Sequence, residues 1–279
     1  MPDSSSDNPE AGSKETSSSS ISKRFTSEID VRWGDILLLV CFFVAGLVDS
    51  AAFNMYGCFV SMQTGNTIFV GLGVSHQPEN LPGKAWSRCF LAIVCFALGA
   101  LFFSSFHRHF GPQKRWVLIT SFFIQAILTG LVAILATTGA VWNHPHGRET
   151  VHEDGYIIER VQNSFPASDY AAIIILAFQS AGQIVASRVL KYNAMPTVVL
   201  TSLYCDMMSD AKLFTAPIND NADRNRRALG AILLFAGAVS GGFLSKSWAG
   251  FAGALWIAAF LKLCITFAWV FWQPKSSKK

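Results

Sequence analysis

The chain alternates between long apolar tracts and short polar connectors. Six tracts approach or exceed the roughly twenty apolar residues that a bilayer-spanning helix needs, and two more are shorter or more polar. This pattern predicts an all-α, polytopic helical membrane protein with about six full spans plus two short broken or re-entrant helices. The six long tracts are Trp33 to Met55, Ala85 to Phe106, Trp116 to Thr138, Asp169 to Leu190, Ala228 to Ser245 and Trp248 to Trp272. The two weak tracts are Phe59 to Val74 and Met195 to Lys212.

The order of the tracts suggests an internal duplication. Each half contains one long tract, one weak tract and then two more long tracts. The halves span about residues 33–140 and 168–272. Residue matches agree with this order, since Tyr56 aligns with Tyr192 and the run from Arg88 aligns with the run from Arg227. A duplicated membrane protein is expected to hold a substrate or ion site near the midplane, where its halves meet.

The weak tracts decide the topology. If both cross the bilayer, there are eight helices and the halves are parallel copies; if both are re-entrant or broken, there are six spans and the halves are inverted copies. With six spans and the N-terminus inside, the basic connectors at 107–115 and 223–227 and the basic tail at 274–279 are all cytoplasmic. We favour this arrangement, with a transmembrane domain at 31–273 and an extramembrane loop at 143–168.

Composition and charge agree with a membrane protein. The 279 residues are 51% hydrophobic and 14% charged, whereas soluble domains carry about a quarter charged residues. Residues 1–30 are rich in Ser and charged side chains and are predicted to be a disordered tail. We expect no signal peptide, because the first apolar run is itself long enough to span. The net charge of +4 indicates cytoplasmic anchoring of loops rather than nucleic-acid binding.

Polar residues gather in the middle of the first weak tract, FVSMQTGNTIFVGLG, where Gln63, Thr64, Gly65 and Asn66 are adjacent. Irregular backbone survives at membrane depth only where protein or a wet cavity surrounds it, since unsatisfied backbone groups are costly in hydrocarbon. One interpretation is a broken helix with its polar edge turned into a cavity. The alternative is a packed span whose glycines let a neighbouring helix approach.

Further polar residues interrupt the other tracts. A charge at the bilayer centre costs at least about 2.5–3.5 kcal/mol, so we expect Asp49 and Asp206 to face the bundle interior and Lys262 to pair with an aspartate. Two alternatives stay open: Asp206 lies at a helix end in water, and the glutamines only lock helices together. The residues of this group are Asp49, Gln125, Gln179, Gln183, Thr201, Asp206 and Lys262.

No enzymatic or metal-binding set stands out. All six histidines fall in connectors, and all six cysteines fall in apolar tracts without C-x-x-C spacing, as expected of small core residues. The chain has no G-x-S-x-G, no H-E-x-x-H and no phosphate loop. We therefore expect no enzyme activity, no catalytic residue, no metal and no cofactor.

The stretch AGLVDSAAFNMYGCFVSMQTGNTIFVGLG resembles the signature of the YoaK-like membrane proteins, the domain of unknown function 1275. Family members carry AG-x-x-D followed by F-V-x-x-x-T-G-N, and the resemblance runs from about Gly34 to Trp272. The chain departs from the family at Gln183-Ile184 and Ser187-Arg188, where members often have Asn and Arg. The resemblance implies a multi-span integral membrane protein and implies no particular substrate.

These observations lead to one main functional hypothesis and one rival. The main hypothesis is a secondary transporter or channel-like carrier of a small polar solute, coupled to a proton or cation. Its site would comprise Asp49, Gln63, Thr64, Gly65, Asn66, Gln179, Gln183, Thr201 and Asp206. The rival is a non-transporting membrane scaffold that assists partner enzymes. The expected partners are a lipid bilayer and a small polar solute or ion, with no nucleic acid and with self-association left open.

Overall fold

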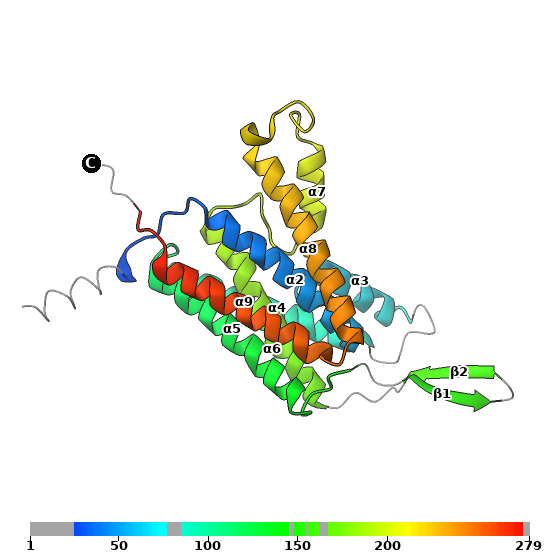
Figure 1. The fold of residues 1–279 in the computed structure, drawn as a ribbon. Coiled ribbons are helices and arrows are strands. Elements are labelled where there is room, and N and C mark those ends of the chain that lie inside the picture. The colour runs from blue at the N-terminus through cyan, green and yellow to red at the C-terminus, as the bar shows by residue number, and fades with distance from the viewer. Residues whose placement is uncertain (1–24, 77–84, 145–147, 154–155, 162–166, 276–279) are drawn as a thin grey trace, which may run out of the picture.

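A computed structural model describes residues 25–76, 85–144, 148–153, 156–161 and 167–275 (Figure 1). Six of the helices that it describes have 22 to 26 residues and are long and apolar enough to cross a membrane. The chain is therefore a multi-pass helical membrane protein, as the apolar tracts predicted. The six helices are α2 (Gly34–Tyr56), α4 (Ala85–Phe110), α5 (Arg115–Thr137), α6 (Ala167–Val189), α8 (Ala222–Lys246) and α9 (Gly250–Phe271).

The two weak tracts form short helices that follow irregular chain. Helix α3 (Gln63–Val74) has 12 residues and α7 (Leu200–Met208) has 9. At about 1.5 Å per residue neither can cross a hydrocarbon layer about 30 Å thick. The arrangement with six spans and two short helices is confirmed, and an arrangement of eight crossing helices does not fit.

The connectors carry the remaining regular structure. In the loop expected at 143–168, β1 (Arg148–Glu153) pairs antiparallel with β2 (Tyr156–Val161), and a short 3-10 helix η1 (Ile218–Asp220) precedes α8. Figure 1 shows the hairpin outside the helix bundle. The helical domain itself contains no strand among the described residues.

The long helices pack in pairs. Helix α2 packs along α8, α4 along α6, and α5 along α9, while contacts of α2 with α9 and of α5 with α6 close the bundle. Helix α3 lies against α4, and α7 lies against α8. One apolar core joins side chains of α2, α4, α5, α6 and α9, so the middle of these helices is held by several neighbours at once.

Close approach of α2 and α8 depends on residues without side chains. A Cβ added to Gly46 would collide with the backbone carbonyl of Leu234, and one added to Gly241 would collide with Ser50 and with the carbonyl of Leu47. Small residues let membrane helices approach until their backbones are in contact. In lipid the hydrophobic effect does not drive helices together, so van der Waals packing at such contacts stabilises the pair. The sequence predicts such packing for the glycines of the first weak tract; at Gly46 and Gly241 it occurs without having been predicted.

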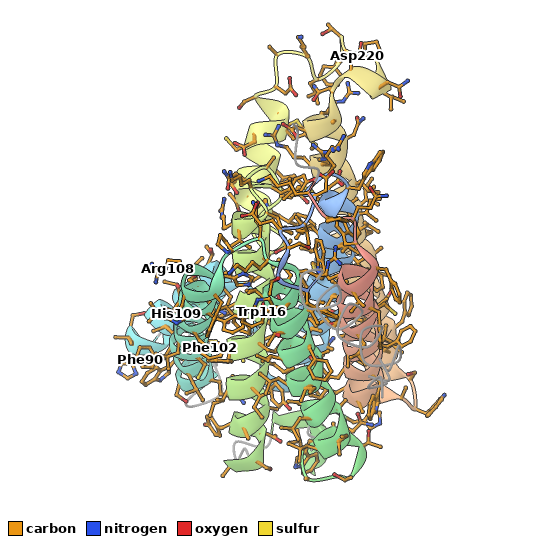
Figure 2. The ribbon with its side chains drawn as sticks, turned by 90° about the vertical axis from the view of Figure 1, so that its left-hand side faces the viewer. Phe90, Phe102, Arg108, His109, Trp116 and Asp220 are labelled. Carbon is orange, nitrogen blue, oxygen red and sulfur yellow. The ribbon has the colours of Figure 1, made fainter. Side chains whose placement is uncertain are left out.

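The outer face of α4 is apolar and exposed. Phe90 is 52% exposed and Phe102 is 43% exposed, and Figure 2 shows both on the outside of the bundle, with Arg108 and His109 nearer one end of the helix. A row of apolar side chains with charged residues at its end suits a helix that faces lipid along its length and water at its terminus.

The described ends of the chain lie together. The backbone N–H of Ile29 donates to Gln113 O at 3.0 Å, and that of Asp30 donates to Gln273 O at 3.0 Å. Ile29 is fully buried. Residues 1–24 of the expected disordered tail lie outside the described residues, whereas its last residues pair here with the α4–α5 connector and with the chain after α9.

Candidate functional site

The first interruption is the segment 57–62 between α2 and α3, where buried main chain leaves the helical conformation. Helix α2 ends at Gly57 in the left-handed region, with φ of 64°. The chain then returns to the level of Asp49, whose Oδ1 accepts the backbone N–H groups of Val60 and Ser61, each at 2.8 Å. The hydroxyl of Ser61 donates to Asp49 Oδ2. A single buried carboxylate therefore satisfies three donors of the unwound segment.

Asn66 completes this arrangement from the first turn of α3. Its Oδ1 accepts the N–H of Phe59 at 2.9 Å, and its Nδ2 donates to Phe59 O at 2.6 Å and to Gln63 Oε1 at 2.8 Å. Gln63 Nε2 in turn donates to Val60 O at 3.0 Å. The sequence correctly placed a sheltered polar interruption here, but Asp49, Gln63 and Asn66 direct these hydrogen bonds to backbone and to one another.

The other two residues of the T-G-N motif have separate roles. A Cβ on Gly65 would lie 2.9 Å from the ring of Phe59, so the glycine makes room for that ring. The Phe59 ring also stacks on Phe53 with 4.8 Å between centroids. Thr64 is exposed, and its side chain forms no hydrogen bond with a described residue. The interruption is thus closed by aromatic packing on one side.

The second interruption, between α6 and α7, is held differently. The hydroxyl of Ser187 donates to Met195 O at 2.6 Å and to Tyr192 O at 3.1 Å. Thr201 and Asp206 lie on α7 with exposed side chains. The expectation that Asp206 faces the bundle interior is wrong, because α7 packs only one side against α8 and leaves this residue outside. The alternative, in which Asp206 lies near a helix end, fits the structure.

A second polar cluster lies in the middle of three spans. Lys262 of α9 is 1% exposed, and its Nζ donates to Gln125 Oε1 of α5 at 3.0 Å and to Gln179 Oε1 of α6 at 2.5 Å. Within the described residues it forms no ion pair. The expected pairing of Lys262 with an aspartate is therefore corrected: two amide oxygens solvate the ammonium group.

The two polar clusters meet on α6. Ser180, the neighbour of Gln179, donates to Val60 O at 2.9 Å. The consecutive residues Gln179 and Ser180 of α6 thus contact Lys262 and the unwound segment before α3, respectively. The sequence did not single out Ser61 or Ser180, because a lone serine in an apolar tract carries no signal until its neighbours in space are known.

Gln183 lies one turn beyond Gln179 and is 2% exposed. Its side chain forms no hydrogen bond with a described residue. Gln125 Nε2 is likewise buried without a hydrogen-bond partner in the described part of the chain, and the Gln125 amide occupies the space that a side chain at Gly182 would fill. The Nε2 group of Gln125, whose Oε1 binds Lys262, is therefore a buried amide donor without an acceptor in the described part of the chain.

Three expectations about single residues need correction. His107 was placed outside the apolar tracts, but α4 continues to Phe110 and buries it completely, with Nδ1 at 3.3 Å from Pro112 O. Cys205 and Cys264 are exposed, whereas the other four cysteines are buried as expected, and all six are free thiols. No group of three potential metal-binding side chains occurs among the described residues.

A groove of about 500 Å³ lies at the end of the bundle near the chain termini. Its lining includes Arg32, Trp33, Phe271 and Trp272, with Trp33 71% exposed and Phe271 74% exposed. Exposed aromatic residues beside a charge at a helix end are typical of the boundary between hydrocarbon and headgroups. The groove contains none of the candidate residues, so it is separate from the Lys262 cluster.

A scan against protein-family models matches residues 37–268 to DUF1275, described as a protein of unknown function. The match covers more than half of the chain and confirms the resemblance drawn from its T-G-N segment. No curated protein matches the sequence, and no solved structure matches it.

Proposed function

The chain belongs to DUF1275, a family of proteins of unknown function, and from that premise we propose that it is a secondary carrier of a small polar solute, driven by a proton or cation gradient. The solute would pass through the middle of the helix bundle. The observation that carries this proposal is Lys262, a cationic side chain almost fully buried halfway along a membrane span.

A buried lysine in a span is expensive and marks function by default. Insertion of a charge at the bilayer centre costs at least about 2.5–3.5 kcal/mol, and such residues are commonly found on ion or substrate pathways. Gln125, Gln179 and Lys262 come from three helices that close one bundle, so their contact point is where a pathway between the helices would run.

The helix pairing supports an internal repeat with inverted halves. If α2–α5 correspond to α6–α9, the pair α2 with α8 corresponds to α6 with α4, and α2 with α9 corresponds to α6 with α5. The pair α5 with α9 corresponds to itself. Each half contains three spans, so the second half runs in the opposite direction to the first. Inverted repeats with short broken helices are the architecture of many secondary transporters.

In the proposed carrier, the two interruptions are the segments that move during transport. Both α3 and α7 are short helices joined to the bundle by irregular chain, and each packs mainly against one partner, α4 or α8. Asp49 and Asn66 are positioning residues that hold the first interruption in shape. Because Asp49 is occupied by backbone donors and Asp206 is exposed, neither is assigned a place in the binding site.

The experiment is flux into liposomes that contain the purified protein. A panel of neutral, zwitterionic, cationic and anionic solutes is tested with wild type, Lys262→Met and the control Lys212→Met, which removes an exposed lysine. We expect at least tenfold flux over protein-free liposomes for one solute class, lost in Lys262→Met and kept in Lys212→Met. Folded wild type with no flux for any solute would favour the rival, a membrane scaffold.

A further inference from the structure

We infer that the Lys262 cluster binds a small monoanion, such as a monocarboxylate. This inference rests on the proposed carrier function and names the class of solute that the same site would accept. It follows from three features of the cluster, namely its uncompensated charge, its surplus of hydrogen-bond donors and its position beside the start of α3.

The charge is the first feature. Lys262 is buried among α5, α6 and α9, and within the described residues its partners are two neutral amides and no carboxylate. A buried cation is poorly compensated by dipoles alone, whereas an opposite charge at contact distance compensates it well in a low dielectric. One negative charge balances the site. A dianion would leave a buried excess charge, and a cation would be repelled.

The donors are the second feature. Gln125 and Gln179 direct their Oε1 atoms at the ammonium group of Lys262. Their amide N–H groups do not bind this ammonium group and remain available as donors. Gln125 Nε2 is buried without a partner in the described chain, and Gln183 forms no hydrogen bond there. Buried polar groups are normally satisfied, and exceptions need an explanation. A ligand with acceptor oxygens supplies one.

The position of α3 is the third feature. Ser180 of α6 binds Val60 O, which places the unwound segment next to Gln179. Helix α3 begins at Gln63, and the side chain of its N-cap residue, Met62, forms no capping hydrogen bond. The N-terminal end of a helix carries partial positive charge and favours anions. Transporters use the N-termini of broken helices in this way to bind anionic groups of their substrates.

The test combines flux with binding. Proteoliposomes receive labelled lactate as the monoanion, succinate as the dianion, erythritol as the neutral solute and choline as the cation. Binding is measured separately, as the change in Tm of the detergent-purified protein on addition of sodium lactate, sodium nitrate or, as a salt control, sodium sulfate. We expect lactate or nitrate to raise Tm of wild type and at least tenfold selective flux of lactate over the other three solutes.

Two variants make the result specific. Lys262→Met should lose both the Tm shift and the lactate flux. That variant also removes two buried hydrogen bonds, which can lower stability by itself. Gln183→Leu is therefore the second variant. Gln183 forms no hydrogen bond with described residues, so this change should leave the Tm of the ligand-free protein unchanged. We expect Gln183→Leu to raise the half-saturating lactate concentration at least fivefold.

The outcomes separate the two proposals. Flux of erythritol or choline without flux of any monoanion would overturn the anion inference and leave the carrier standing. A Tm shift that needs Lys262, without flux of any solute, would support the anion site and overturn the carrier. Absence of both flux and Tm shift would overturn both.

Discussion

Asp49 binds Ser61 twice, through the backbone N–H at 2.8 Å and through the hydroxyl group. This contact brings the chain after α2 back beside the helix it has just left. The polar residues of the FVSMQTGN stretch are thus explained by backbone that would otherwise lie unsatisfied inside the membrane. The arrangement makes Asp49 a structural residue whose removal should be measurable.

Replacing Asp49 with Ala should destabilise the protein strongly. The change leaves two buried backbone N–H groups and one hydroxyl without their acceptor, and each such group costs about 1–3 kcal/mol. We expect the free energy of unfolding, measured by titration with a denaturing detergent, to fall by about 3 kcal/mol or more. The control Asp206→Ala removes an exposed carboxylate and should change it by less than about 0.5 kcal/mol. Equal stability of the two variants would contradict the role of Asp49.

Replacing Asn66 with Asp should loosen the unwound segment specifically. The carboxylate has no N–H to donate, so its second oxygen would face the acceptors Phe59 O and Gln63 Oε1. We expect amide hydrogen exchange in residues 57–62 to accelerate at least about tenfold, equivalent to about 1.4 kcal/mol. The matched variant Asn54→Asp lies on an exposed face of α2 and should leave this exchange unchanged.

Adjacent glycines of α8 offer a matched pair for the α2 contact. Gly241→Ala places a methyl group against Ser50 and Leu47 O, whereas Gly242→Ala meets nothing within 4 Å. Overpacking should cost about 1–3 kcal/mol in the first variant. The second should stabilise the helix by about 0.5–1 kcal/mol, because alanine is a better helix former. A neutral Gly241→Ala in the same unfolding assay would show that α2 and α8 are farther apart.

An ion pair joins α2 and α8 at the end of this helix pair that lies opposite to Gly241. Arg226 Nε lies 2.7 Å from Asp35 Oδ2, and the guanidinium group lies 5.3 Å from the ring centroid of Tyr192. A double-mutant cycle with Arg226→Ala and Asp35→Ala should give a coupling energy of about 1 kcal/mol, at the upper end for partly exposed pairs. The exposed pair of Arg32 with Asp30 should give less. Additive effects at Arg226 and Asp35 would exclude a direct interaction.

Six spans place both ends of the described chain on one side of the membrane and the hairpin on the other. Single cysteines at Ser27, Lys275 and Thr150, in a variant without native cysteines, can be tested with a membrane-impermeant maleimide. We expect Ser27 and Lys275 to react from the cytoplasmic side, as the basic connectors predict, and Thr150 only from the opposite side. Reaction of all three from one side would contradict the three spans that separate the hairpin from each end of the described chain.

Hydropathy alone located the six spans and both interruptions, because span length and the cost of polar groups in hydrocarbon are local properties of a segment. Gly65 and Asn66 also marked the break between α2 and α3. The partners of the polar side chains were not predictable in the same way. Lys262 contacts amides rather than an aspartate because of which helices pack together, and neither hydropathy nor residue spacing encodes that pairing.

The exposure of Thr201 and Asp206 has a related cause. Both weak tracts looked alike as interrupted apolar segments, so the sequence suggested equivalent sites. In the first, Asp49 and Asn66 bind the unwound chain. In the second, Ser187 holds the chain close to the end of α6, and α7 presents much of its surface outward. Similar hydropathy therefore conceals a difference that only the tertiary contacts resolve.

The pairing of residues 28–30 with the connector at 113 and the segment 273–275 joins the two ends of the described helical domain. Because the two ends of the described helical domain already touch, the domain is close to a closed loop. Joining them and opening the loop in the link between α5 and α6 would give a circular permutant in which the second half precedes the first. Folding of this permutant would show that the order of the two groups of three spans along the chain does not determine the architecture.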